Sequence, residues 1–407
     1  MTPFDLDLAI RAARGERPGY AALAAAHGMH PPGQIAAVAK LLEATMATDA
    51  AMDRPFRAAI LAARGRGGLP APGFFAAARA LGRWTGPDTG PEAAAMVAAA
   101  RAWWAEAIPP QTDALWALAR YAALRPGLPP ARFPADTLRA ATLADLADRY
   151  DAFILDAYGV LNRGDAAIPG APERIAALQR QGKRVLVLTN GASLPPAAAR
   201  AKYARWGFAF DPADIIASRA LAATALAALQ AAHPGPWAAI GPADAGLDDL
   251  PGDIRPLDRD LLEGAAGFLF LGAQSWTDDR QAALEVALEN RPRPVLCANP
   301  DLVAPLETGF SREPGAFCHR LARLGHAVHF TGKPYPAAFA AARARLPGIP
   351  ARRIAMVGDS PHTDILGGAA AGLASVLVTG HGLLRGLEPA VVIAATGIRP
   401  NALCPDP

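Results

Sequence analysis

About the first 145 residues carry apolar side chains at helical spacing. Ile35, Val38 and Leu42, for example, recur at intervals of three and four residues, which places them on one face of a helix. Turns rich in proline and glycine separate such runs. The pattern predicts an all-helical region, with helices over residues 6–14, 20–27, 35–45, 50–64, 74–81, 91–107 and 113–124.

From about residue 145 onward, short apolar runs alternate with helical segments. We expect strands over residues 153–155, 184–188, 237–240, 267–271, 294–297, 326–330, 353–357 and 375–379. This alternation is typical of βαβ units, so we predict an α/β fold with a mainly parallel, doubly wound sheet. The proline-rich stretch 126–134 is the predicted linker, because consecutive prolines resist helix formation. Residues 396–407 are expected to form an irregular tail.

Composition narrows the class of protein. At 407 residues the chain is longer than one typical domain, and 52% hydrophobic with 19% charged residues describes a folded globular protein. Lys+Arg 40 against Asp+Glu 37 is too even a balance to favour nucleic acid or an anionic membrane as a partner. Cys297, Cys318 and Cys404 are too widely spaced for a metal site, and they favour a reducing cytoplasm. We expect no signal peptide and no membrane span.

A loose basic cluster lies in the helical region, formed by Arg54, Arg57, Arg64 and Arg66. One interpretation is the phosphate-contacting patch of a small nucleic-acid-binding module. The other is a solvated helix face on a packing or dimerisation domain. The even charge of the whole chain favours the solvated face.

Polar groups follow several of the predicted strands at the point where each strand ends. Because the carboxyl ends of parallel strands meet at one edge of a sheet, we expect these groups to converge on one crevice. They are Asp156 after residues 153–155, Thr189 and Asn190 after 184–188, Lys333 after 326–330, and Asp359 after 353–357, with Asp364 close behind.

These residue types suit phosphate chemistry. The Asp156 carboxylate can accept a phosphoryl group as an aspartyl-phosphate. Mg²⁺ prefers hard oxygen ligands, and Asp156 and Asp359 can supply two of them. Lys333 is a positive charge that can hold nucleophile and phosphate together, while Asp364 can hold a metal-bound water or orient Lys333.

Phosphate oxygens can also be bound by the turn after residues 184–188. The Thr189 hydroxyl and the amides of Asn190 and Gly191 are suitable donors. Taken singly, each of these features has an ordinary structural explanation: a plain turn, a solvated loop lysine or a helix cap. Their combined occurrence in order at strand ends favours a phosphate site.

Residues 146 to about 400 resemble the haloacid-dehalogenase-like hydrolase superfamily, in particular its branch of capped sugar-phosphatase and p-nitrophenyl-phosphatase-like proteins. The segments that carry the resemblance are 156–161 (DAYGVL), 189–191 (TNG), 297–301 (CANPD), 332–334 (GKP) and 358–360 (GDS), with Asp364. The resemblance implies a core over 141–221 and 306–400 with an inserted α/β cap over 222–305. It leaves a helical domain over 1–140 and a tail over 401–407.

The resemblance also implies a role for each matching residue. Asp156 would be the nucleophile and a Mg²⁺ ligand, and Thr189 the phosphate binder. Lys333 would stabilise charge, and Asp359 would be the second carboxylate ligand. The backbone carbonyl of Tyr158 would complete the protein ligands.

Tyr158 departs from the pattern of phosphatases in this superfamily, which usually have a second Asp two residues after the nucleophile. That Asp acts as general acid and base, a contribution of ~10²–10⁴-fold. A phenol with a pKa of ~10 is a poor base at neutral pH, although its hydroxyl can donate a proton or a hydrogen bond. Strand alternation predicts that Tyr158 points to the same side as Asp156.

Three consequences of Tyr158 stay open: a slow phosphatase, a different acid/base such as Asp165 or a cap residue, or a move to binding or regulation. The same form of the motif occurs in the superfamily's dehalogenases, which need no metal. Asp359 and Asp364 argue against that chemistry, because carbon–halogen displacement has no use for a Mg²⁺ site.

The cap is expected to close over the crevice and to choose the substrate. Residues 241–246 and 271–276 either line its pocket or are ordinary surface loops, and His362 either contacts substrate or lies in an exposed loop. Asn299 and Asp301 are expected to organise the connection between cap and core.

The sequence thus predicts a cytoplasmic, Mg²⁺-dependent hydrolase of a small phosphate monoester, with no nucleic acid or membrane partner. The alternative is a weakly active or inactive relative that binds a ligand, with its helical domain binding a partner. A homodimer formed through the cap or the helical domain is compatible with either.

Overall fold

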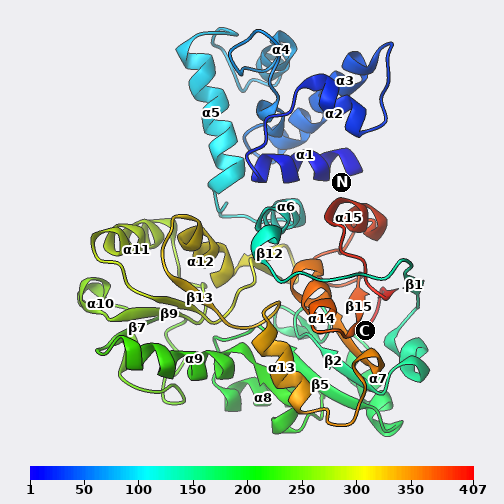
Figure 1. Cartoon of the computed structure of the whole chain (residues 1–407), viewed down its shortest axis with the longest axis vertical. Helices are drawn as coiled ribbons and strands as arrows, with labels where there is room; N and C mark the ends of the chain where they lie inside the picture. The colour runs from blue at the N-terminus through cyan, green and yellow to red at the C-terminus, as the bar shows by residue number, and fades with distance from the viewer. The chain divides into compact units, whose positions relative to one another are not determined.

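The computed structural model describes residues 1–407, which form two compact units (Figure 1). One unit contains residues 1–109, 114–126 and 390–396, and the other contains 110–113, 127–389 and 397–407. None of the helices combines the length and the apolar character that crossing a bilayer requires.

The first unit is helical, as the sequence predicts. Its elements are α1 (Pro3–Ala13), α2 (Tyr20–Ala26), α3 (Gln34–Ala51), the 3₁₀ turn η1 (Arg57–Ile60), α4 (Pro72–Ala80), α5 (Pro91–Glu106), α6 (Ala114–Leu124) and α15 (Pro389–Thr396). The helix predicted over 50–64 is wrong. Helix α3 runs on to Ala51, Asp53 has a positive φ of 50°, and only a short 3₁₀ turn follows.

Arg57 is fully buried, so it belongs neither to a solvated helix face nor to a phosphate-contacting patch. Its Nε lies 2.9 Å from Asp49 Oδ1, and its backbone N–H donates to Asp49 Oδ2 at 2.8 Å. Arg54 is also buried. Both interpretations of the basic cluster require exposed side chains, so they are wrong for these two arginines. A buried charge needs a partner inside the fold, and Asp49 is that partner for Arg57.

The second unit contains a seven-stranded parallel sheet in the order β1-β16-β15-β14-β2-β5-β6. Its strands are β1 (Leu138–Arg139), β2 (Ala152–Leu155), β5 (Arg184–Thr189), β6 (Ile215–Ala217), β14 (Ile354–Gly358), β15 (Ala374–Val378) and β16 (Ala402–Cys404). The turn η2 (Arg125–Gly127) spans the point at which the chain passes from the first unit to the second. The helical elements around the sheet are η3 (Leu143–Arg149), α7 (Ala171–Arg180), α8 (Pro196–Arg205), η4 (Pro212–Asp214), α13 (Pro336–Ala344), η5 (Ala351–Arg353), the π-helical turn η6 (Pro361–Ile365) and α14 (Leu366–Ala370).

Side-chain alternation along the central strands builds two hydrophobic layers. Phe153 and Leu155 of β2 pack in a cluster with residues of η3 and α7, whereas Ile154 packs in a second cluster with Phe339 of α13. Both sides of the sheet are therefore covered by helices, which confirms the predicted doubly wound α/β core.

Residues 401–407 are not the irregular tail that the sequence suggested. Strand β16 pairs in parallel with β15 and with β1, and Ala402 and Cys404 are fully buried. A strand of three residues is too short to show a hydrophobic period, so its pairing depends on contacts with distant parts of the chain.

A second parallel sheet has five strands, in the order β13-β10-β9-β7-β8, and we call it the cap sheet because four of them lie within the predicted cap segment 222–305. Its strands are β7 (Trp237–Ile240), β8 (Ile254–Pro256), β9 (Gly267–Phe270), β10 (Val295–Cys297) and β13 (Val328–Phe330). Helices α9 (Ser218–Ala232), α10 (Arg259–Gly264), α11 (Asp278–Asn290) and α12 (Pro314–Arg323) accompany it (Figure 1). Two small antiparallel ribbons complete the unit: β3 (Asn162–Arg163) with β4 (Ala166–Ala167), and β11 (Val303–Pro305) with β12 (Phe310–Arg312).

The position of β13 corrects one expectation. The sequence suggested that the strand before Lys333 belongs to the same sheet as the strands before Asp156 and Asp359. In the structure β13 pairs with β10 of the five-stranded sheet, so this sheet extends beyond the predicted cap boundary at residue 305. The apolar pattern identifies a strand but not its pairing partner.

Candidate active site

Asp156 lies immediately after β2, the strand that runs between β14 and β5 in the seven-stranded sheet. Asp359 follows β14, and Thr189 is the last residue of β5. Because these three neighbouring strands are parallel, their carboxyl ends lie at one edge of the sheet. The convergence that the sequence predicted for these three residues is confirmed.

Three buried carboxylates meet at this edge. Asp156, Asp359 and Asp364 each offer an oxygen, and these oxygens lie within 4.8 Å of one another. Each of the three groups accepts a backbone amide: Ala157 N–H donates to Asp156 Oδ1 at 2.6 Å, Ser360 N–H donates to Asp364 Oδ2 at 3.1 Å, and Leu383 N–H donates to Asp359 Oδ2 at 2.7 Å. The arrangement can hold a divalent cation, since hard cations take carboxylate oxygens.

Gly159 makes room for this cluster. Its φ is +78°, in the left-handed region that glycine adopts without strain, and a Cβ there would lie 2.6 Å from Asp359 Oδ2. Only a residue without a side chain therefore allows the turn after Asp156 to pass so close to Asp359.

Lys333 reaches the carboxylates from the loop that follows β13. Its Nζ lies 2.5 Å from Asp156 Oδ1 and 2.7 Å from Asp364 Oδ1, and the side chain is almost completely buried. The core sheet and the cap sheet thus both contribute to one site, whereas the strand before Lys333 was expected to belong to the core sheet. The contact with Asp364 agrees with the prediction that this residue orients Lys333.

The side chain of Asn190 holds the Lys333 loop against the core. Its Oδ1 accepts the Lys333 N–H at 2.7 Å, and its Nδ2 donates to the Lys333 carbonyl at 3.0 Å and to Asp301 Oδ1 at 2.9 Å. Sequence reasoning assigned phosphate binding to the Asn190 amide and gave the side chain no role. The structure shows the side chain in a positioning role.

The ionisation of the carboxylates reflects their burial. Burial raises the pKa of Asp156 to about 8, with Lys333 opposing this rise and Asp364 adding to it. Burial and the neighbouring Asp364 and Asp156 likewise raise the pKa of Asp359 well above its ordinary value. One ammonium faces three carboxylates here, which leaves two negative charges when all three are ionised, so a divalent cation would balance the cluster.

Thr189 is held by a hydrogen bond within the site. Its Oγ1 accepts the Gly191 N–H at 3.1 Å. Burial raises the pKa of the Tyr203 phenol, and the Thr189 hydroxyl lowers it. Sequence reasoning did not find Tyr203, because an aromatic residue on a helix is ordinarily a packing residue.

Tyr158 is not part of β2, which ends at Leu155, so strand alternation is not what orients it. Its hydroxyl accepts a hydrogen bond of 3.2 Å from Lys202 Nζ, which also lies 5.0 Å from the centre of the Tyr158 ring. Burial and nearby carboxylates raise the pKa of the Tyr158 phenol. The sequence gave no indication of Lys202, since its helix begins seven residues after Thr189 and carries no motif.

The remaining candidates occupy different places. Asp165 has a 91% exposed side chain, with one oxygen 3.7 Å from Lys202 Nζ. His362 is fully buried in the π-helical turn, so the exposed-loop interpretation is wrong. Asn299 donates to Glu313 Oε2 at 3.0 Å, and its Oδ1 accepts the Asp301 N–H. Together with the Asn190–Asp301 contact, these bonds connect the segment after β10 to the core.

Family profiles recognise both halves of this unit. A profile described as haloacid dehalogenase-like hydrolase matches residues 153–244, and a second profile of HAD-hydrolase-like proteins matches residues 330–397. Human chronophin is 32% identical over 287 residues, which cover 64% of this chain and 91% of chronophin. The chain belongs to the haloacid dehalogenase-like hydrolases.

Other relatives and solved structures agree with this membership. Human glycerol-3-phosphate phosphatase is 32% identical over 271 residues, covering 58% of this chain and 80% of that protein. The crystal structure of a possible sugar phosphatase from Cytophaga hutchinsonii superposes with a TM-score of 0.58 at 25% identity, covering 66% of this chain and 98% of that one. A haloacid dehalogenase-like hydrolase from Brucella suis gives a TM-score of 0.55 at 26% identity, covering 65% and 98%. The predicted family and fold class are confirmed.

Proposed function

We propose that this haloacid dehalogenase-like hydrolase cleaves a small phosphate monoester through an aspartyl-phosphate on Asp156. The observation that carries the proposal is the Lys333 ammonium, which lies between Asp156 and Asp364 beside Asp359. A lone Asp at a strand end has many uses, but three converging carboxylates with a buried lysine suit an anionic substrate.

The carboxylate cluster fits Mg²⁺. Asp156, Asp359 and the backbone carbonyl of Tyr158 would hold it, with Asp364 near enough to hold one of its waters. When bound, the ion supplies positive charge that offsets repulsion between the nucleophile and the phosphate dianion.

The chain's own residues account for the two chemical steps. An Asp156 oxygen attacks phosphorus, the bond from phosphorus to the ester oxygen breaks, and that oxygen leaves as an alkoxide that takes a proton from solvent water or from the Tyr158 hydroxyl. Lys333 fixes the orientation of Asp156 and stabilises the negative charge of the phosphoryl group. Water then attacks the phosphorus and releases Asp156 with inorganic phosphate. Thr189 lies at the adjacent strand end, where its hydroxyl can donate to a phosphate oxygen while the Gly191 N–H donates to Thr189 Oγ1 and holds that hydroxyl in place.

Protonation of the leaving ester oxygen is the step for which this site has the weakest catalytic group. The Tyr158 hydroxyl can donate a hydrogen bond to the leaving oxygen, since its contact with Lys202 uses Oη only as an acceptor. A phenol is a poorer general base than a carboxylate at neutral pH. We therefore infer faster hydrolysis of esters with good leaving groups. The same observation favours the second candidate function, a weakly active protein that mainly binds its ligand.

The test is hydrolysis of p-nitrophenyl phosphate with Mg²⁺, with EDTA, and by Asp156→Asn. We expect turnover that requires Mg²⁺ and falls at least 100-fold in Asp156→Asn, roughly the loss of a nucleophilic group. Wild-type protein that binds Mg²⁺ but releases no p-nitrophenol would overturn the phosphatase proposal and leave the binding function.

A further inference from the structure

The cap sheet has a ligand crevice of its own. After β7 the chain forms β8 on one side and then β9 on the other, so the strand order reverses between β7 and β9. In parallel sheets ligands bind outside the carboxyl ends of the strands at such a point. A cavity of about 770 Å³ lies there, lined by residues that directly follow these strands, including Gly241, Leu257 and Leu271. Residues of loops 241–246 and 271–276 therefore line a cavity, although from the sequence we expected any such pocket at the phosphate crevice.

The cavity is separate from the phosphate site. Asp156, Thr189, Lys333 and Asp359 are absent from its lining. Lys333 follows β13, which is three strand positions from β7 in the same sheet, or about 14 Å at ~4.8 Å per strand. A small phosphate monoester held at Lys333 does not fill a cavity at that distance.

A buried arginine links the two places. Arg219 Nη2 donates to the Gly246 carbonyl of the cavity wall at 2.5 Å, and its Nη1 donates to the Ala192 carbonyl at 3.1 Å. Ala192 is three residues after Thr189. A ligand that shifts the 241–246 loop therefore acts directly on the segment that follows the phosphate-binding turn.

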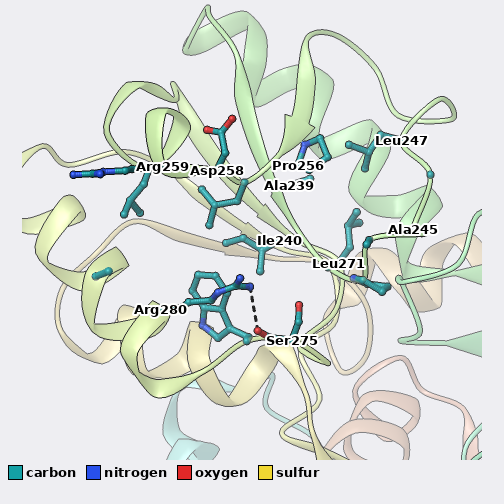
Figure 2. A pocket seen from close by; sticks show the side chains of 18 residues that line it. Ala239, Ile240, Ala245, Leu247, Pro256, Asp258, Arg259, Leu271, Ser275 and Arg280 are labelled. Atoms are coloured by element: carbon teal, nitrogen blue, oxygen red, sulfur yellow. Dashed lines mark hydrogen bonds between the residues drawn. The ribbon is translucent and has the colours of Figure 1, made fainter.

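The walls of the cavity are mostly apolar. Ile240, Leu247, Leu271 and Trp276 contribute hydrocarbon surface, and Figure 2 shows Ile240 at the centre of the pocket. The Trp276 indole N–H is already used, since it donates to Gln281 Oε1 at 2.9 Å. The cavity volume lies within the range of ~300–1,000 Å³ that small-molecule sites occupy. The walls therefore fit an apolar body.

The charged groups of the cavity favour an anion. Arg259 and Arg280 are opposed only by Asp258, so two positive charges and one negative charge leave a net charge of +1. Asp258 already caps α10 by accepting the Leu261 N–H. Figure 2 shows Arg280 extending toward Ser275, whose carbonyl accepts one hydrogen bond of 3.1 Å from Arg280 Nη1. A guanidinium has five N–H donors, and no carboxylate of the chain pairs with this one.

We propose that this cap pocket binds a small apolar molecule or group that carries one negative charge, with Arg280 as its main anion partner. The pocket would recognise such a group by the same contacts whether the group is one end of a long substrate or a separate regulatory ligand. In the first case the phosphate lies at Lys333 and the acidic end of the substrate lies at Arg280.

The first experiment measures binding of 2-naphthoate to the full chain by calorimetry. We expect saturable binding to the wild type, at least tenfold weaker binding to Arg280→Ala, and no binding to Ala283→Trp, which fills the cavity from an exposed helix position. Arg352→Ala is the matched control, because it removes one exposed arginine from the core and should bind like wild type. The neutral analogue 2-naphthalenemethanol should bind at least tenfold more weakly. No saturable binding, or equal affinity in wild type and Arg280→Ala, would overturn the proposal.

A kinetic experiment then distinguishes a charged group that is part of the substrate from a separate regulatory ligand. If the group is part of the substrate, 12-carboxydodecyl phosphate, whose extended chain is long enough to span about 14 Å, should have at least tenfold higher kcat/KM than tridecyl phosphate, and Arg280→Ala should abolish the difference. If the ligand is separate, saturating 2-naphthoate should change p-nitrophenyl phosphate turnover in wild type but not in Arg280→Ala. This second experiment rests on the proposed phosphatase function, whereas the binding measurement does not. Binding without hydrolysis would therefore overturn the phosphatase alone.

Discussion

Lys202 donates a hydrogen bond of 3.2 Å to the hydroxyl of Tyr158, the residue that stands where related phosphatases usually carry a second aspartate. The ammonium also lies 4.7 Å from the centre of the Trp206 ring, so an aromatic and cationic cluster borders the candidate nucleophile. This pairing fixes the phenol in place and gives Lys202 a partner that is not a carboxylate.

Replacing Tyr158 with aspartate should increase phosphatase turnover. Tyr158→Asp restores a carboxylate that can protonate the leaving group and activate water, effects worth ~10²–10⁴-fold in such reactions. Initial rates on p-nitrophenyl phosphate and on an alkyl phosphate measure this, with the larger gain expected for the alkyl ester. Tyr158→Phe serves as the control and should not exceed wild type. Equal rates for Tyr158→Asp and wild type would favour the binding function.

Removing the buried ammonium of Lys333 should destabilise the protein as well as inactivate it. Lys333→Met leaves Asp156 and Asp364 without their positive partner, and breaking a buried ion pair costs about 3–5 kcal/mol. Urea unfolding at pH 7 gives the free energy of unfolding. Lys40→Met, at an exposed position of α3, should change that free energy by less than about 0.5 kcal/mol. A loss below about 1 kcal/mol in Lys333→Met would show that the carboxylates do not need this charge.

Mg²⁺ should stabilise the wild type through the carboxylate cluster. Binding to the folded state alone adds about 2.7 kcal/mol when the ion is at 100 times its Kd. Thermal unfolding at increasing Mg²⁺ should therefore show a rising midpoint in wild type and a much smaller rise in Asp359→Asn. Asp244→Asn, on a cap loop, is the control and should respond like wild type. The same rise in Asp359→Asn and wild type would place the metal elsewhere.

Stability should depend on pH through Glu313. Burial raises the pKa of Glu313 from 4.5 to about 7 in the folded state. The folded protein therefore holds this proton more tightly than the unfolded chain does, and stability from this group falls as pH rises from about 4.5 to 7. Glu313→Gln removes this dependence, so its stability relative to wild type should increase over that range by up to about 3 kcal/mol. Urea unfolding at pH 5 and pH 8 measures the change, and a constant difference between the two proteins would contradict it.

The helical unit should depend on Arg57. Arg57→Met removes the guanidinium that lies 2.9 Å from the buried Asp49 carboxylate and leaves only Arg54 as a nearby positive charge, which should cost about 3–5 kcal/mol. Tryptophan fluorescence during urea unfolding is a suitable measurement, because the Arg57 guanidinium lies 5.7 Å from the Trp104 ring. Arg64→Met is the matched control from the same sequence cluster, and its exposed position predicts a change within about 0.5 kcal/mol. Equal stability of the two variants would show that burial of Arg57 does not matter.

The sequence by itself determined the α/β class, the family and the strand ends that carry Asp156, Thr189 and Asp359. Hydrophobic period and turn residues are local properties, and parallel strands necessarily share an edge, so these conclusions needed no knowledge of pairing. The carboxylate cluster that the structure brings together consists of residues that the motifs had already singled out.

Only the tertiary structure decided which sheet each short strand joins and which side chains face the site. Strand β13 belongs to the cap sheet and β16 to the core sheet, because pairing depends on contacts between distant segments. Lys202 contacts Tyr158, which lies 44 positions earlier in the sequence. Arg57 is buried and paired with Asp49, although the arginines near it in the sequence suggested a charged surface. Such contacts follow from how helices and sheets pack against each other, which no local spacing in the sequence records.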